Sequence, residues 1–203
     1  AGIGHAADGT DAGGSVRIPA SFCGLVAIEP SVGRVGNYPP SAAGSLGHIG
    51  PITRTVADAA LMLNVMAGPD PRDPAGLPAD GIDYLDGLDD GIRGLRIAFS
   101  PTLGYAKVDP EVAALVAAAA EAFEDLGGRV ERVDAPFDNP TACFRTHFYA
   151  GISHALRDVP AEKLSLLDPG LLPILEEART MGLRQYMEAV DSRLALSRAA
   201  KMF

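Results

Sequence analysis

The chain has 203 residues, of which 47% are hydrophobic and 21% charged, and its formal net charge is −9. This composition is typical of a globular protein with a substantial core, and the acidic balance argues against binding to nucleic acid or to an anionic membrane, which require basic patches. The two cysteines, Cys23 and Cys143, cannot form a disulfide framework, and no apolar run is long enough to cross a bilayer, so we expect a cytoplasmic protein.

The glycine-rich run at residues 9–20, Gly-Thr-Asp-Ala-Gly-Gly-Ser-Val-Arg-Ile-Pro-Ala, is the clearest candidate site. Two glycines directly precede Ser15, and because they lack Cβ atoms, their backbone N–H groups can turn into one concavity that would bind an oxyanion. Asp11 and Arg17 flank the turn, and an ion pair between them would fix its geometry. A Gly-Gly-Ser sequence alone is more often a surface turn, so the assignment depends on its context.

After this turn the sequence predicts a short helix, a strand and a Pro/Gly-rich loop, at residues 15–22, 25–28 and 29–51. Thr55, with Asp58 three positions later, resembles a capping box and predicts a helix that Gly68-Pro69 ends. Residues 69–94 contain many Pro, Asp and Gly, and we expect them to form an irregular, exposed connection.

Residues 95–134 show the pattern of a βαβ unit. An apolar strand at 95–99 precedes a helix that Asp109-Pro110 caps and Gly127-Gly128 closes, and a second strand follows. Such a crossover requires the two strands to be parallel in one sheet. Helices are expected throughout residues 135–203, with breaks near Pro160, Pro169 and Gly182.

Two blocks of the sequence resemble the amidase signature family. Residues 9–20 match the family hallmark G-T-D-x-G-G-S-[IV]-R-x-P-A, and residues 50–60 match G-P-x-x-R-[TS]-V-x-D-A-A. Two ordered blocks at the expected separation are far more specific than either block alone. One departure is visible: where the family usually has Gly-x-Lys-Pro, this chain has Ala27-Ile28-Glu29-Pro30, so an anion replaces a cation.

The resemblance implies an α/β fold with a mixed central sheet covered by helices on both faces. We expect the chain to be a fragment of that fold, a single partial amidase domain over residues 1–203. Within it we distinguish the nucleophile motif with its following helix, the irregular connection, the βαβ unit and the helical segment, at residues 1–68, 69–94, 95–134 and 135–203.

The resemblance also implies the roles of the residues in the turn. Ser15 would be the nucleophile, and Asp11 and Arg17 would support the turn. The oxyanion would be bound by the backbone N–H groups of Ala12, Gly13, Gly14 and Ser15. In the family a second serine and a lysine complete the triad, and both lie N-terminal to the motif.

Residues 1–14 contain neither a lysine nor a serine, and the lysines of the chain, Lys107, Lys163 and Lys201, lie far downstream. We therefore expect the chain to be catalytically inactive by itself. A Ser-His-Asp triad would need a histidine, and nothing in the spacing of the four histidines selects one of them. The histidines are His5, His48, His147 and His154.

In the full-length parent, the resemblance implies hydrolysis of the C–N bond of a linear carboxamide through a serine acyl-enzyme. No cofactor is implied, and no metal site is expected, because the sequence has no H-x-x-x-H or C-x-x-C pair. The partners expected are a small-molecule amide and a second copy of the chain in a homodimer. Two alternatives stay open: the A subunit of a glutamine-dependent tRNA amidotransferase, and a non-catalytic remnant or binding module.

Overall fold

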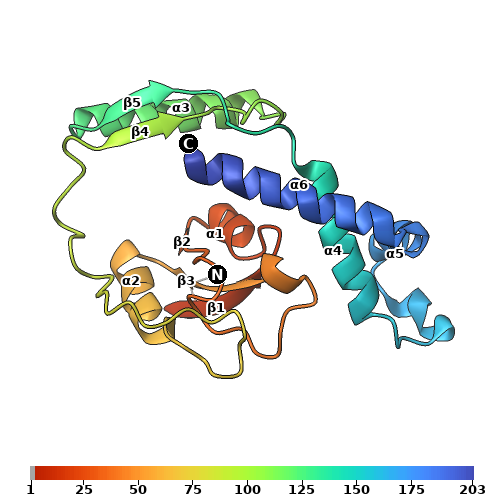
Figure 1. Cartoon of the computed structure of the whole chain (residues 1–203). Helices are drawn as coiled ribbons and strands as arrows, with labels where there is room; N and C mark the ends of the chain where they lie inside the picture. Colours follow the sequence, from red (N-terminus) through yellow and green to blue (C-terminus); the bar gives the residue numbers. More distant parts are fainter. Residues whose placement is uncertain (1–2) are drawn as a thin grey trace. The chain divides into compact units, whose positions relative to one another are not determined.

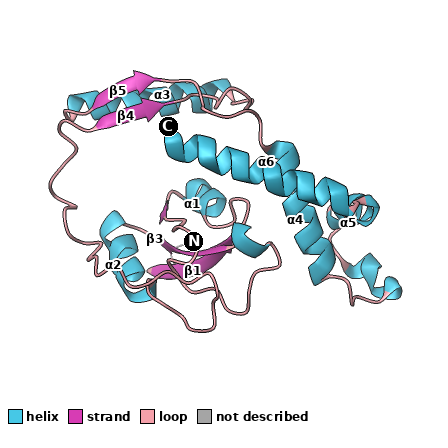
Figure 2. Ribbon diagram, viewed as in Figure 1, coloured by secondary structure: helices cyan, strands magenta, loops and turns pink. Residues whose placement is uncertain are grey.

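The computed structural model describes residues 3–203 and has a mixed α/β architecture (Figure 1 and Figure 2). The chain groups into two compact units. The first unit contains Ala1–Leu88 and Thr146–Met181, and the second contains Asp89–Arg145 and Gly182–Phe203. Each unit is therefore assembled from two separate segments, a division that the sequence pattern did not indicate. The single partial domain stays a prediction.

The first unit contains a three-stranded antiparallel sheet with the order β1-β3-β2. Its strands are β1 (Ala6–Asp11), β2 (Val26–Ala27) and β3 (His48–Thr53). The register places Asp11, the last residue of β1, opposite His48, the first residue of β3. This pairing fixes the point at which the glycine-rich turn leaves the sheet.

The prediction of a loop as far as residue 51 is wrong at its end, because β3 begins at His48. Glycine and proline within β3 have low strand propensity, and they concealed the strand in the sequence pattern. The structure explains one of these glycines. A Cβ on Gly50 would overlap the carbonyl oxygen of Ile28, so only glycine allows β3 to lie this close to the segment that follows β2.

Helices α1 (Arg17–Cys23) and α2 (Val56–Met66) agree with the sequence predictions. The hydroxyl of Thr55 accepts a hydrogen bond from the Asp58 N–H at 3.1 Å, which confirms the predicted N-cap of α2. Val16, Ala59 and Leu63 are buried and belong to the hydrophobic core of the first unit.

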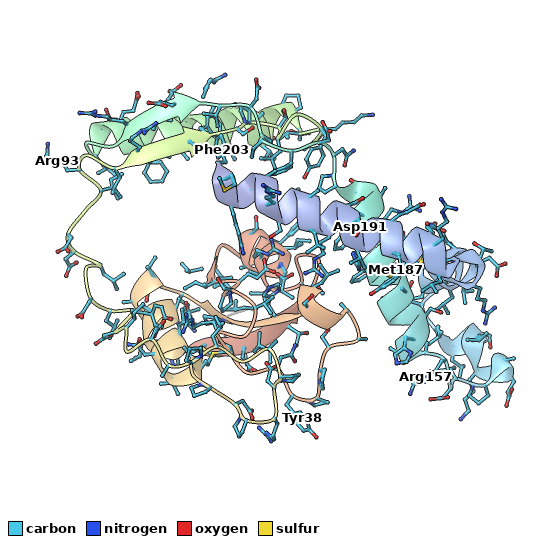
Figure 3. All side chains as sticks on the ribbon, viewed as in Figure 1. Tyr38, Arg93, Arg157, Met187, Asp191 and Phe203 are labelled. Atoms are coloured by element: carbon cyan, nitrogen blue, oxygen red, sulfur yellow. The ribbon has the colours of Figure 1, made fainter. Side chains whose placement is uncertain are left out.

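The connection at residues 69–94 contains neither helix nor strand, as predicted. It is nevertheless tied to the loop after β2. The Leu77 N–H donates to the Gly33 carbonyl at 2.8 Å, and the Arg72 guanidinium lies 4.9 Å from the ring centroid of Tyr38, which is labelled in Figure 3. The short 3₁₀ helix η1 (Gly44–Leu46) lies between this loop and β3.

The second unit contains the predicted βαβ unit. Strands β4 (Arg96–Phe99) and β5 (Arg129–Arg132) are parallel and are joined through α3 (Pro110–Asp125). The Asp109 carboxylate caps α3 by accepting the Glu111 N–H at 2.9 Å. Within residues 3–203 the strands thus form two sheets, an antiparallel one of three strands and a parallel one of two strands.

The C-terminal part of the chain is helical, as predicted. Its elements are α4 (Thr141–Ala155), the 3₁₀ helix η2 (Ala161–Leu166), α5 (Leu171–Thr180) and α6 (Leu183–Met202). The Cys143 thiol of α4 donates to the Ala189 carbonyl of α6 at 3.3 Å, whereas Met187 and Asp191 project from the exposed surface of α6 (Figure 3). None of the helices in residues 3–203 combines the length and the apolar character needed to span a membrane.

Candidate active site

The glycine-rich turn is folded around the carboxylate of Asp11, whose side chain is only 1% exposed. Its oxygen Oδ1 accepts the Gly14 N–H at 2.5 Å, and Oδ2 accepts the N–H groups of Val16 and Arg17 at 3.1 and 3.3 Å. One buried carboxylate thereby satisfies three backbone donors in the segment that leads into α1. Asp11 fixes the path of the chain from β1 to α1.

The predicted ion pair between Asp11 and Arg17 is confirmed. Nε and Nη2 of Arg17 donate to Oδ2 and Oδ1 of Asp11, each at 3.0 Å, in a bidentate arrangement. Burial by itself would raise the pKa of Asp11, but the guanidinium and the three backbone N–H groups outweigh burial and hold the pKa well below its usual range. The hydrogen bond to Asp11 in turn raises the pKa of Arg17. Both groups are therefore charged.

Ser15 lies on the exposed side of the turn, between two buried residues, Gly14 and Val16. Gly14 has φ +114°, a conformation that residues with a side chain rarely adopt, and a Cβ there would lie 2.5 Å from Cδ1 of Ile18. Only glycine fits position 14. The turn consequently buries its two neighbours and leaves the serine accessible.

The backbone N–H groups of the turn divide into two sets. The Gly14 N–H donates to the buried carboxylate of Asp11, and its predicted role in binding an oxyanion stays a prediction. The N–H groups of Ala12, Gly13 and Ser15 have no hydrogen-bond acceptor within the described residues 3–203.

One further side chain, Glu29, contacts Arg17, and a second, His48, contacts Glu29; the sequence pattern assigned neither to the site. Oε2 of Glu29 lies 2.7 Å from Nε of Arg17, and Oε1 of Glu29 lies 2.8 Å from Nδ1 of His48. The only signal in the sequence was the unmatched anion at position 29. Its partner His48 could not be identified without the register of β1 and β3.

The other candidates for a catalytic base lie on elements outside the turn. All three lysines are exposed, in the loop after β4, in η2 and in α6; they are Lys107, Lys163 and Lys201. Of the histidines, His5 is exposed near the start of β1, and His147 and His154 lie on α4. Among residues 3–203 no cluster of His, Cys, Asp and Glu side chains is arranged to hold a metal ion.

Comparison with known proteins identifies close relatives of this chain. A family model described as Amidase matches residues 1–197. An acylamidase from Rhodococcus erythropolis is 43% identical over 144 residues, which are 70% of this chain and 30% of the relative. The A subunit of a glutamyl-tRNA(Gln) amidotransferase from Rubrobacter xylanophilus is 49% identical over 138 residues, which are 67% of this chain and 29% of the relative. The chain thus spans less than a third of the length of these curated relatives.

Solved structures show the same fold. A bacterial aryl acylamidase of the amidase signature family superposes with a TM-score of 0.82 and 32% identity, over 95% of this chain and 42% of that one. A 6-aminohexanoate cyclic dimer hydrolase in complex with substrate superposes with a TM-score of 0.83 and 26% identity, over 97% and 44% of the two chains. The predicted fold class is confirmed. The match to the family model spans both motif blocks, and the chain belongs to the amidase signature family.

Proposed function

We propose that this chain carries the nucleophile and the oxyanion-binding turn of an enzyme that hydrolyses carboxamide C–N bonds. The observation that supports this proposal best is the construction of the turn. An ion pair between the buried Asp11 and the half-exposed Arg17 holds the turn, on which Ser15 is exposed. The neighbouring N–H groups of Ala12 and Gly13 have no acceptor within residues 3–203. Relatives described as acylamidase and amidase support the same reaction class.

In the proposed reaction, Oγ of Ser15 attacks the amide carbonyl carbon while its proton passes to a base. The N–H groups of Ala12, Gly13 and Ser15 bind the oxyanion, and each well-placed donor contributes about 3 kcal/mol to transition-state stabilisation. The C–N bond then breaks as the amine nitrogen is protonated, which leaves an acyl-serine. Water attacks this ester, and its hydrolysis releases the carboxylic acid and regenerates the hydroxyl of Ser15.

We propose that the base is the family's lysine, acting through its bridging serine, and that neither belongs to these 203 residues. A lysine accepts a proton only when burial favours its neutral form, and the three lysines of this chain are exposed. The 203-residue chain alone should therefore be inactive.

The experiment uses the protein expressed from the full reading frame that encodes this chain. A fluorophosphonate probe should label Ser15, and Ser15→Ala should abolish labelling and lower kcat by about a thousandfold or more. Ser21→Ala is the matched control, because Ser21 is also an exposed serine but lies on α1, outside the turn. Labelling that persists in Ser15→Ala would reject the proposed nucleophile.

A second candidate function is the A subunit of a glutamine-dependent tRNA amidotransferase. The 49% identity to a relative of that description supports it. The two functions differ in their requirement for a partner. An independent amidase hydrolyses small amides alone, whereas the amidotransferase component would release ammonia from glutamine for its partner. Assaying the full-length protein with small amides and with glutamine, with and without that partner, separates the two.

A further inference from the structure

Glu29 occupies a position that the backbone holds firmly beside the nucleophile turn. The N–H of Ile28 donates to the Pro51 carbonyl at 3.2 Å, and Gly50 allows the Ile28 carbonyl to lie against β3. Pro30, on the other side of Glu29, is buried. Because both neighbours are anchored, the Glu29 side chain starts from a defined point next to β3.

The carboxylate of Glu29 connects two groups on different elements. Oε2 contacts Nε of Arg17 at 2.7 Å, and Oε1 contacts Nδ1 of His48 at 2.8 Å. Arg17 also binds Asp11, whose backbone pairs with that of His48 across the β1–β3 ladder. These four residues, Asp11, Arg17, Glu29 and His48, close a ring around the base of the turn, which we call the Glu29 ring.

The charges in the Glu29 ring explain why the histidine belongs to it. Two carboxylates contact one guanidinium, so the single positive charge of Arg17 does not balance both negative charges. Nδ1 of His48 gives the Glu29 carboxylate its second contact. Nδ1 of His48 also lies 3.0 Å from the Leu46 carbonyl oxygen. Because both oxygens near Nδ1 are acceptors, the Nδ1–H tautomer of His48 fits this arrangement.

We propose that Glu29 is a positioning residue for the nucleophile turn: it holds the half-exposed Arg17 side chain in its bidentate contact with Asp11 and holds His48 in the Nδ1–H form. The inference rests on the proposed function of the turn. An arginine side chain has high rotamer entropy, and a second anchor keeps its guanidinium in place. Because the turn acts in the transition state, its looser positioning lowers kcat more than it raises KM.

Glu29→Gln tests the proposal, because the amide keeps the shape of the side chain but offers one acceptor and one donor where the Glu29 ring requires two acceptors. In the full-length protein, kcat and the rate of fluorophosphonate labelling should fall by about tenfold to a hundredfold, with KM within about twofold of the wild type. The matched control is Glu131→Gln, which alters an exposed Glu–Arg pair in the second unit. It should leave kcat, KM and labelling unchanged.

Two further measurements separate positioning from a general loss of stability. In ¹⁵N NMR of the histidine rings, wild-type His48 should show a protonated Nδ1, and Glu29→Gln should change the Nδ1 signal. His48→Asn, whose Nδ2 can occupy the place of Nδ1, should retain more activity than His48→Ala. The comparison of the two His48 variants remains usable if Glu29→Gln folds poorly.

Wild-type kcat in folded Glu29→Gln would overturn the proposal, as would a loss of kcat no larger than the loss of folded protein. Equal kcat values for His48→Asn and His48→Ala would also overturn it. Failure of the proposed function is distinguishable, because Ser15→Ala would then keep its activity. The Nδ1 signal of His48 would still report whether Glu29 holds the imidazole.

Discussion

Replacing Arg17 with alanine should destabilise the chain through the carboxylate that it leaves behind. The guanidinium donates two hydrogen bonds of 3.0 Å to Asp11, and without them this buried group keeps only its backbone donors. Breaking a buried charge pair costs about 3–5 kcal/mol. However, the Arg17 side chain is 52% exposed, so water already screens part of the attraction between its guanidinium and the Asp11 carboxylate. We therefore expect the free energy of unfolding to fall by about 2 kcal/mol.

Thermal denaturation measures this loss. In a protein of about 200 residues, 1 kcal/mol shifts Tm by about 2–4 °C, so Arg17→Ala should lower Tm by about 4–8 °C. Arg17→Lys should fall between wild type and Arg17→Ala, because an ammonium group cannot bond both carboxylate oxygens as a planar fork does. The matched control is Arg96→Ala, which removes an exposed pair with an N···O distance of 3.5 Å and should change stability by less than about 0.5 kcal/mol.

Activity of the full-length protein should fall together with stability in Arg17→Ala, because the same contacts shape the turn that carries Ser15. The reasoning is refuted if Arg17→Ala keeps wild-type Tm and activity. It is also refuted if Arg17→Ala and Arg96→Ala lower Tm equally, since the buried carboxylate would then contribute nothing specific.

Three further predictions follow from the same region and from α2. Gly14→Ala should lower the free energy of unfolding, measured by thermal denaturation, by about 1–3 kcal/mol and should reduce Ser15 labelling, because it combines a strained φ with overlap on Ile18. Gly24→Ala is the control, since Gly24 has φ +62° but open space around it, and it should destabilise less. Equal losses of stability would contradict the overlap. Because its contacts hold the pKa of Asp11 below the usual 3.8, ionised Asp11 stabilises the fold above about pH 4, and this stabilisation is lost as the pH falls through the lower pKa of the folded state. The Tm difference between wild type and Asp11→Asn should therefore be smaller at pH 2 than at pH 6, and a constant difference would exclude this linkage. Thr55→Ala should cost about 1 kcal/mol in thermal denaturation by removing the N-cap of α2, and an unchanged Tm would show that solvent caps the helix equally well.

Local signals in the sequence predicted most helices and the βαβ unit, because their boundaries depend on neighbouring residues. Thr55 and Asp109 cap helices through contacts two or three residues away. Strands β1 and β3 lacked such signals, since their stability comes from pairing partners distant in sequence, such as Asp11 and His48. The division into two units also depends on distant contacts, and no composition shift marked it.

Within the candidate site, the residues that act over short distances could be predicted, and the others could not. Asp11 and Arg17 are six positions apart around one turn, so their pairing was visible in the motif itself. The engagement of the Gly14 N–H by Asp11 was not visible, because four adjacent N–H groups look equivalent until the carboxylate is placed beneath one of them.

Glu29 shows how an apparent mismatch in a sequence can carry information about structure. Against the family pattern, a carboxylate stands in place of a lysine near the turn. In the structure this carboxylate lies between two donors, Arg17 and His48, and removing its charge would leave donors facing an amide. A charge that departs from a family pattern is therefore best read together with the partners that the fold brings to it. Here those partners lead directly to the base of the turn that carries Ser15.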